Sequence, residues 1–354
     1  MPASFLSSRP LGPAEIQVSA LSLGSWRTYE RLPAETGVAI LRAARDEGIN
    51  FFDDARYNDE TGTAPMRTGY SEVLFGELFR RAGMRRDETV VTNKLWWEFW
   101  PQQSAAAELD ASLQRMGFDY VDVIYANAPP RGMAVADLVA AMDGLVVSGT
   151  ARAWGMVNWP ADLVGQASQA AASLGVMQPC AVQLPYSLVR RSWVEDPAMT
   201  RALSASGAAV IASFCLAGGV LTGKYLSGTT AGRAAGTLND PRVAAAGAVA
   251  EELARLARRL ETTPAALALA FPLTNPAVIS ALFGATSAEQ VRANCAAIGL
   301  LDRLGRDDLA QLQRIGLAED HGQAGDAAQV LPAMGRAGLT RQPLPLTGPP
   351  HVRD

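Results

Sequence analysis

The sequence predicts a (β/α)8 barrel, and three observations support this fold class. Short apolar runs rich in Val and Ile alternate with longer segments of helical periodicity along most of the 354 residues. Such alternation predicts a parallel sheet, and eight strand–helix units in about 250 residues or somewhat more are typical of a closed barrel. The first run ends in Gly24–Tyr29 (GSWRTY). It lacks the G-x-G-x-x-G pattern of a doubly wound sheet, so we favour the barrel over that rival fold.

The predicted strands are apolar runs of strand length that alternate with the predicted helices. In chain order the strands span Ala20–Gly24, Phe51–Phe52, Thr89–Thr92, Val121–Ala126, Ala151–Met156, Cys180–Gln183, Ala208–Phe214 and Val278–Phe283. The helices place an apolar residue at every third or fourth position, as Leu109, Leu113 and Met116 do. They cover Pro33–Glu47, Ser71–Arg81, the region of Leu109–Met116, the region of Leu138–Leu145, Leu163–Leu174, Val243–Leu260, Pro264–Leu273 and a last segment through Gln290.

Both ends of the chain differ from its repeating part. We expect an N-terminal hairpin ahead of the first strand, and we assign residues 1–315 to the barrel domain. From about Gly316 onward, Gly, Pro, Ala and scattered charges show little periodicity. We therefore assign residues 316–354 to a C-terminal extension, loosely ordered or packed over the barrel, rather than to a second domain.

The composition excludes several classes of protein. A net charge of −4 offers no basic face for a nucleic acid. The chain starts without an apolar leader, and its most apolar stretch, Pro264–Phe283, is broken by Pro272 and Pro276. We therefore expect no membrane span and a cytoplasmic protein. The three cysteines are widely spaced in apolar contexts, which predicts reduced core residues. A homo-oligomer is compatible with all of these features.

Histidine is scarce, and this limits the chemistry open to the barrel. The two histidines are His321 and His351, so neither a histidine-based zinc site nor a Ser-His-Asp triad fits the barrel, and we expect no metal. Gly218–Tyr225 begins like a P-loop, but Tyr225 replaces the magnesium-binding Ser or Thr, which argues against nucleoside triphosphate hydrolysis. We interpret Gly218–Gly236 as a loop that folds over a dinucleotide, with a plain linker as the alternative.

Polar side chains follow most of the predicted strands, at the end where the chemistry of barrels lies. The residues at these ends are Ser25 with Trp26, Asp53 with Asp54, Lys94, Asn127, Asn158, Gln183, Phe214 and Gly284. Buried polar groups must find partners, so a converging ring of them is better explained by a functional site than by chance. We therefore predict a site at one mouth of the barrel.

The combination of Asp53, Tyr57 and Lys94 predicts proton transfer. A phenol with an ordinary pKa of about 10 is a weak acid at neutral pH, but a nearby ammonium stabilises its phenolate form. A carboxylate behind the ammonium keeps it charged, so the trio suits protonation of a carbonyl oxygen during reduction. Asn127 would orient that carbonyl by hydrogen bonding, or else is a turn residue before Ala128–Pro130. The alternatives for Asp53 and Lys94 are a helix cap and a solvated side chain.

Four large aromatic residues closely follow Lys94, namely Trp96, Trp97, Phe99 and Trp100. So many rings within one short segment cannot all belong to the core. We predict an apolar substrate pocket lined by Trp26, Tyr57, Trp96 and Trp97. A packed loop or a subunit contact is the alternative.

Seven segments resemble signatures of the aldo-keto reductase superfamily, in the order in which that family has them, between Arg9 and Leu301. They are GINFFDDARYN, VVTNK, YVDVIYANAPP, GMVNW, VQLPYSLVRR, LAGGVLTGKY and LFGATSAEQVRANCAAIG. The closest resemblance is to the branch of voltage-gated potassium channel β-subunits and their bacterial relatives. It implies a (β/α)8 barrel that binds NADP(H) without a Rossmann domain and reduces a small-molecule carbonyl compound.

The resemblance also implies roles for single residues. Asp53, Tyr57 and Lys94 match three members of a catalytic tetrad, and Asn127 stands where most of the superfamily has histidine. The implied cofactor contacts come from Ser25, Trp26, Asp53, Asn158, Gln183, Phe214, Leu216, Gly219, Leu221, Lys224, Arg233, Gly284, Thr286, Gln290 and Asn294. Among them, Asn158 and Gln183 match residues that hold the carboxamide.

Three features depart from the pattern of the family. The segment between Asp53 and Tyr57 is one residue shorter than usual. Ser213 occupies the position of the aromatic residue that stacks on nicotinamide, which leaves this role to Phe214. Ala293 stands where the branch often has an acidic residue near the adenine.

These observations lead to one main functional hypothesis. The protein reduces an aldehyde or ketone with NADPH, and Tyr57 gives the proton. The alternative is a regulatory or redox-sensing subunit that binds NADP(H) tightly and turns over slowly. An isomerase or lyase on the same barrel would need no nicotinamide.

Overall fold

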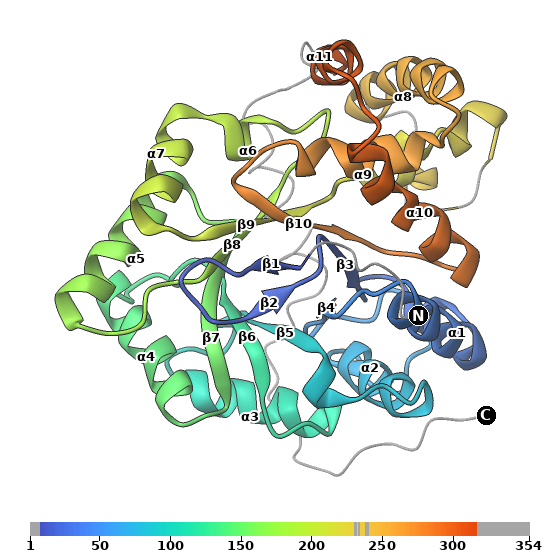
Figure 1. Cartoon of the computed structure of the whole chain (residues 1–354). Coiled ribbons are helices and arrows are strands. Elements are labelled where there is room, and N and C mark those ends of the chain that lie inside the picture. Colours follow the sequence, from blue (N-terminus) through green and yellow to red (C-terminus); the bar gives the residue numbers. More distant parts are fainter. Residues whose placement is uncertain (1–7, 230–231, 233, 238–240, 317–354) are drawn as a thin grey trace.

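The computed structural model of the chain describes residues 8–229, 232, 234–237 and 241–316. Eight strands form a closed barrel in the order β10-β3-β4-β5-β6-β7-β8-β9, and each pair is parallel (Figure 1). The predicted (β/α)8 fold is therefore confirmed. The C-terminal extension predicted at 316–354 lies, apart from its first residue, outside the described residues, so that assignment stays a prediction.

The barrel strands begin and end close to the predicted apolar runs. They are β3 (Leu21–Gly24), β4 (Phe51–Asp53), β5 (Val90–Leu95), β6 (Val121–Ala126), β7 (Ala151–Val157), β8 (Ala181–Pro185), β9 (Ala209–Ser213) and β10 (Val278–Phe283). Every residue of β5 and β6 is buried, because the barrel interior covers one face and helices cover the other. Asp53 pairs with Thr92 and Lys94 pairs with Tyr125, so the carboxyl ends of these strands open at the same mouth.

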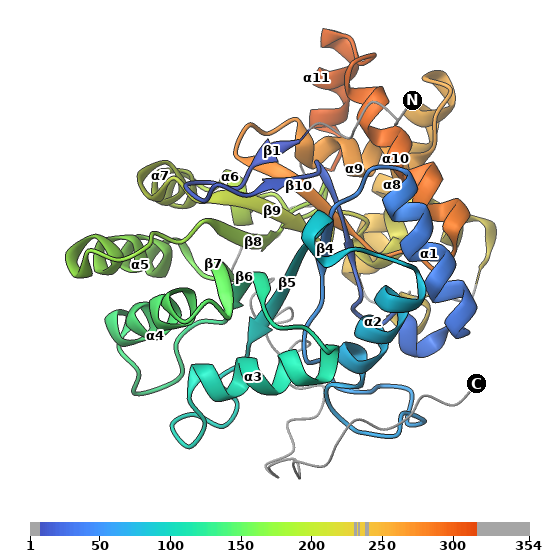
Figure 2. The ribbon, with the colours of Figure 1, turned by 60° about the horizontal axis from the view of Figure 1, so that its bottom comes forward.

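An outer ring of helices surrounds the barrel (Figure 2). Its main members are α1 (Ala34–Asp46), α2 (Tyr70–Arg81), α3 (Ala105–Met116), α4 (Val135–Val147), α5 (Ala161–Leu174), α8 (Pro241–Arg259), α9 (Pro264–Leu273) and α10 (Ala288–Leu301). Two of them, α2 and α3, come unusually close at Gly76, where a Cβ atom would lie 1.9 Å from the carbonyl oxygen of Met116. Only glycine fits this crossing without a shift of one helix.

Several shorter elements were not predicted from the sequence. The helices α6 (Ser192–Glu195) and α7 (Pro197–Ser206) lie between β8 and β9, and α11 (Arg306–Arg314) follows α10. The described residues also form the 3-10 turns η1 (Tyr29–Arg31), η2 (Arg86–Glu88), η3 (Ala217–Thr222), η4 (Lys224–Ser227) and η5 (Ala235–Thr237). A start signal for α7 was present, because Asp196 caps the N–H of Ala198 at 2.8 Å and Pro197 begins the helix.

The predicted N-terminal hairpin is confirmed, and it covers one end of the barrel (Figure 1). Its strands β1 (Arg9–Pro10) and β2 (Gln17–Val18) pair in antiparallel fashion. Leu11, Ile16 and Val18 are buried against side chains of the barrel interior. The hairpin therefore closes the amino end of the barrel, since Phe51 and Val90 at the starts of their strands belong to the same apolar cluster.

The described residues also bear on the composition arguments. All three cysteines are free and buried, as predicted, and burial raises the pKa of the Cys180, Cys215 and Cys295 thiols to about 12. None of the described helices is long and apolar enough to cross a membrane. His321 and His351 lie outside the described residues.

Candidate active site

Asp53, Tyr57 and Lys94 meet at the mouth of the barrel. Asp53 ends β4, Lys94 lies near the end of β5, and Tyr57 follows β4 by a few residues. The Lys94 Nζ atom donates to Asp53 Oδ2 at 2.6 Å and to Tyr57 Oη at 3.2 Å. The lysine is 1 % exposed and the aspartate 4 % exposed, so the ion pair is shielded from water. A buried ammonium thus joins a carboxylate to a phenol, the arrangement that the sequence predicted.

Two neutral side chains complete the surroundings of Asp53. Its Oδ1 atom accepts hydrogen bonds from Thr92 Oγ1 at 2.8 Å and from Gln183 Nε2 at 2.9 Å. Thr92 lies two residues before Lys94, so the strand alternation turns both side chains into the barrel. Thr92 was not among the predicted site residues. Its position two residues before Lys94 in the same strand could have predicted that both side chains point into the site.

Tyr57 is placed by hydrogen bonds of its own backbone. Its N–H donates to the Ala55 carbonyl at 2.8 Å and to Ser71 Oγ at 3.2 Å, and its carbonyl accepts from the Gly69 N–H at 2.8 Å. These contacts tie the loop after β4 to the start of α2. The segment from Asp53 is one residue shorter than the family resemblance implies, yet it brings the phenol oxygen within hydrogen-bond distance of Lys94.

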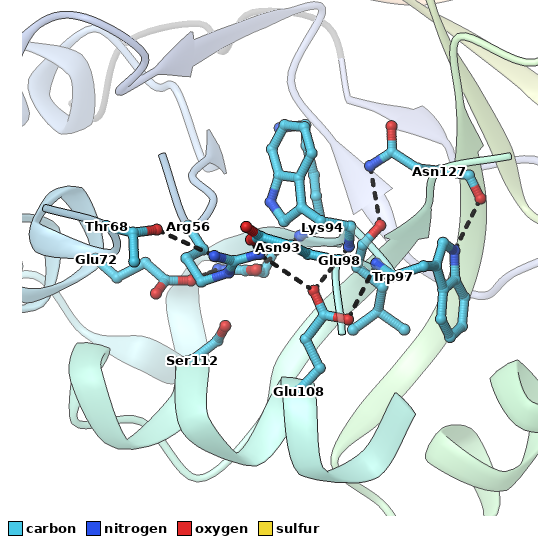
Figure 3. A network of polar contacts seen from close by, with 12 residues as sticks. Arg56, Thr68, Glu72, Asn93, Lys94, Trp97, Glu98, Glu108, Ser112 and Asn127 are labelled. Atoms are coloured by element: carbon cyan, nitrogen blue, oxygen red, sulfur yellow. Dashed lines mark hydrogen bonds and ion pairs between the residues drawn. The ribbon is translucent and has the colours of Figure 1, made fainter. Parts of the chain in front are cut away.

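Aromatic rings surround Tyr57 on the open side of the site. Trp26 and Trp96 have ring centroids 6.5 Å and 6.1 Å from that of Tyr57, and Phe214 lies 5.6 Å from Trp26. Three of the four predicted pocket residues are therefore together. Trp97 does not join them, since it is 5 % exposed and its Nε1 donates to the Asn127 carbonyl at 3.0 Å (Figure 3).

The side chain of Asn127 binds the backbone, as expected for the turn residue that was the alternative to a catalytic role. Its Nδ2 atom donates to the Leu95 carbonyl at 2.9 Å, and its backbone N–H donates to the same carbonyl at 3.1 Å (Figure 3). The side-chain amide thus fastens the end of β5 to the end of β6. A direct role of Asn127 toward a substrate stays a prediction.

Asp54 lies behind the site and has a different environment from Asp53. It is fully buried, its Oδ1 atom accepts from the Ser25 hydroxyl, and its Oδ2 atom has no hydrogen-bond partner among the described residues. Burial and the neighbouring Glu72 carboxylate raise the pKa of Asp54 well above its usual range. Ser25, predicted to contact a cofactor, thus has its hydroxyl directed to this carboxyl group.

Many of the residues that the resemblance assigns to the cofactor follow the carboxyl ends of β7, β9 and β10. Asn158 follows β7, with φ at +57°, and its N–H donates to the Gln183 carbonyl at 2.9 Å. Leu216, Gly219, Leu221 and Lys224 follow β9, and Gly284, Thr286, Gln290 and Asn294 follow β10. Leu221 is fully buried, and its contact with the cofactor stays a prediction. Arg233 lies outside the described residues.

The loops after β9 and β10 carry groups that suit the binding of phosphate. Gly218 and Gly219 have φ of +67° and +91°, and a Cβ atom at Gly219 would lie 3.2 Å from Lys224 Nζ. The second loop leads into α10, where Ser287 Oγ accepts from the Gln290 N–H at 3.3 Å. A glycine turn beside an ammonium and the N-terminus of a long helix are favourable surroundings for the phosphates of a dinucleotide. The residues present therefore fit NADP(H).

A pocket opens beside the Tyr57 ring. It is lined by Trp26, Arg27, Glu30, Tyr57, Asn58, Asp59, Tyr70 and Ser71. Arg27 binds Glu60 through Nη2 at 2.6 Å, and its buried Nε atom has no hydrogen-bond partner among the described residues. The pocket thus combines aromatic walls with polar groups. No periodic pattern marks Arg27, which follows the end of β3.

Comparisons with known proteins agree with this geometry. The model of the aldo/keto reductase family matches residues 20–316. A probable voltage-gated potassium channel subunit beta of Oryza sativa subsp. japonica is 30% identical over 320 residues, which cover 86% of this chain and 95% of the relative. A putative voltage-gated potassium channel subunit beta of Schizosaccharomyces pombe is 32% identical over 327 residues, 87% of this chain and 92% of the relative.

Proposed function

This chain belongs to the aldo/keto reductase family, and we propose that it reduces an aldehyde or a ketone to an alcohol with NADPH as its cofactor. Enzymes of this family are in general NADP-dependent oxidoreductases. The proposal concerns the specific activity of this chain. The observation that carries the proposal is the Lys94 ammonium, which contacts both the Asp53 carboxylate and the Tyr57 hydroxyl. This is the arrangement that a proton donor for a carbonyl oxygen needs.

Tyr57 has the role of general acid in this proposal. When bound, NADPH supplies the hydride for the carbonyl carbon. The Tyr57 hydroxyl gives its proton to the carbonyl oxygen, and the Lys94 ammonium at 3.2 Å stabilises the phenolate left behind. Asp53, held by Thr92 and Gln183, keeps the ammonium in place. A positioned acid of this kind accelerates a reaction by about 10²–10⁴-fold.

The residues near the two phosphate-suited loops would hold the cofactor. Gly219 and Lys224 lie on the loop after β9. Thr286 lies on the loop after β10, and its N–H donates to the side-chain oxygen of Gln290 in the first turn of α10 at 2.9 Å. This contact orders the loop ahead of α10. We assign the pyrophosphate to the first loop and the adenosine end to the second, and we assign stacking on the nicotinamide to Phe214.

The proposed substrate is an uncharged carbonyl compound with an apolar group. Trp26 and Trp96 flank the Tyr57 ring and leave an aromatic surface beside the hydroxyl that would receive the carbonyl. Aromatic walls bind apolar substituents mainly by removing them from water. We therefore expect aromatic and longer aliphatic aldehydes to be better substrates than short ones.

A single-turnover experiment tests the proposed function. The protein is loaded with NADPH and mixed with a panel of aromatic and aliphatic aldehydes and ketones, while the absorbance of the reduced nicotinamide is followed. We expect the wild type to oxidise the bound cofactor. In Tyr57→Phe the rate should fall by about 100-fold or more, because the general acid is lost. Equal rates in the two proteins would refute the role of Tyr57.

A second candidate function is a regulatory subunit that binds NADP(H) and turns over slowly. The observation that favours it is the name of the relatives, which are potassium channel beta subunits. Tight NADPH binding without oxidation by any member of the panel would support this function over the reductase. Absence of binding would reject both.

A further inference from the structure

Two loops at the barrel mouth carry the rings that face each other across the candidate site. The loop between β4 and α2 carries Tyr57, and the loop between β5 and α3 carries Trp96. The two rings meet edge to face, with centroids 6.1 Å apart and planes at 71°. Their separation is set by whatever holds the two loops together, because neither ring lies within a barrel strand.

Glu108 of α3 fixes the second loop from below. It is 5 % exposed, and its carboxylate accepts from two successive backbone N–H groups, that of Trp96 at 2.8 Å and that of Trp97 at 3.2 Å (Figure 3). The loop needs such support, since Trp97 has a φ of +60°, which costs a bulky residue energy and persists only where the surroundings impose it.

Arg56, the residue directly before Tyr57, reaches across to this same loop. Its Nη2 atom binds Glu98 Oε2 at 2.7 Å and lies 3.9 Å from Glu108 Oε1. Its Nη1 atom donates to Thr68 Oγ1 at 3.0 Å, which anchors the arginine within its own loop (Figure 3). The guanidinium is 8 % exposed, so these contacts are largely shielded from water. A planar fork of donors can hold partners on two sides at once, which an ammonium cannot do in the same way.

We propose that Arg56, Glu98 and Glu108 form a loop clamp that positions Tyr57 against Trp96 for the reduction. The inference rests on the proposed function. The three members are positioning residues, because they act through Tyr57 and Trp96 and have no contact with Asp53 or Lys94 among the interactions described above. The clamp gives the short segment between Asp53 and Tyr57 a second fixed point at Arg56. A displacement of about 1 Å at a reacting group costs on the order of 10²-fold in rate, so such a fixed point matters for turnover.

Amide hydrogen exchange tests the structural half of the proposal without any turnover. In Glu108→Gln one oxygen that accepts from the Trp96–Trp97 backbone is replaced by an NH2 group. We expect the peptide that contains these two residues to exchange about tenfold faster or more than in the wild type. The control is Arg152→Met, which breaks an ion pair of 2.7 Å with Asp122 at the opposite end of the barrel. Unchanged exchange in Glu108→Gln would overturn the proposal.

Kinetics test the functional half. For Arg56→Met and Glu98→Gln we expect kcat to fall about tenfold or more, with the Kd for NADPH within about twofold of the wild type. The double variant should be no more than about twofold slower than Arg56→Met, because both changes break one unit. A lower unfolding midpoint with unchanged kcat, or additive effects of the two changes, would reduce these residues to structural ones. If Arg56→Met does not fold, Glu98→Gln alone decides, since it changes only the partner of the arginine.

The two failures can be told apart. If the wild type reduces no carbonyl compound, the proposed function fails, while the exchange experiment still shows whether Glu108 holds the loop. If the wild type is active and the clamp variants keep its kcat, the proposed function stands and the clamp fails.

Discussion

The buried ion pair of Asp53 and Lys94 makes a strong prediction about stability. In Lys94→Met the Asp53 carboxylate stays buried at 4 % exposure and keeps only the donors Thr92 and Gln183, both on Oδ1. Its Oδ2 atom loses the partner at 2.6 Å. Removing one member of a buried pair costs about 3–5 kcal/mol, because an uncompensated charge remains. We therefore expect Lys94→Met to lower the free energy of unfolding by about this amount at pH 7.

A double-mutant cycle isolates the interaction itself. Urea unfolding followed by tryptophan fluorescence is measured for the wild type, Asp53→Asn, Lys94→Met and the double variant. The double variant should be more stable than the sum of the single effects predicts, by about 2 kcal/mol or more, since it buries no charge. The matched control is Arg85 with Asp87, which are joined at the same 2.6 Å but are 63% and 67% exposed. We expect little or no coupling there. Equal coupling in the two cycles would refute the reasoning from burial.

Three further predictions follow from groups outside the tetrad. Burial raises the pKa of Asp54 above the ordinary 3.8. The contribution of the protonated Asp54 to stability is therefore fully present below pH 3.8 and is lost as pH rises through the higher folded-state pKa. The difference in Tm between Asp54→Asn and the wild type should grow in favour of the variant from pH 4 to pH 8, and a constant difference would contradict this. Gly76→Ala should lower the unfolding free energy by about 1–3 kcal/mol through crowding against Met116, whereas Gly144→Ala in α4, with nothing within 4 Å of its Cβ, should not. With a thiol pKa of about 12 at Cys180, the folded protein should resist iodoacetamide at pH 8 and react only when unfolded in urea; fast labelling without urea would show that the site is open.

Much of the fold could be predicted because the barrel repeats one pattern. Apolar runs such as Val121–Ala126 have the same bounds in the structure as in the sequence, since both faces of a barrel strand are buried. Asp53 and Lys94 could be predicted as neighbours for the same reason, because carboxyl ends of adjacent parallel strands share one mouth. The helix α7 was missed although Asp196 and Pro197 mark its start, which shows that short helices give a weak periodic signal.

The details of the site depend on tertiary contacts that no periodicity reports. Trp96 and Trp97 are adjacent in sequence, and only the positive φ of Trp97 and its bond to the Asn127 carbonyl decide that one ring faces Tyr57 and the other is buried. Glu108 holds this loop from the next helix, at a distance in sequence that no motif marks. The short segment before Tyr57 left the position of the phenol open, and backbone contacts of the loop determine it.

Transfer of an isotope tests the central claim most directly. The protein is mixed with NADPH that carries deuterium at both C4 positions of the nicotinamide and with an aromatic aldehyde, and the alcohol is examined by mass spectrometry. The reductase account predicts an alcohol with one deuterium on the former carbonyl carbon, formed at the rate at which NADPH is consumed. Bound NADPH together with an aldehyde that stays unreduced, or an alcohol without deuterium, would contradict it.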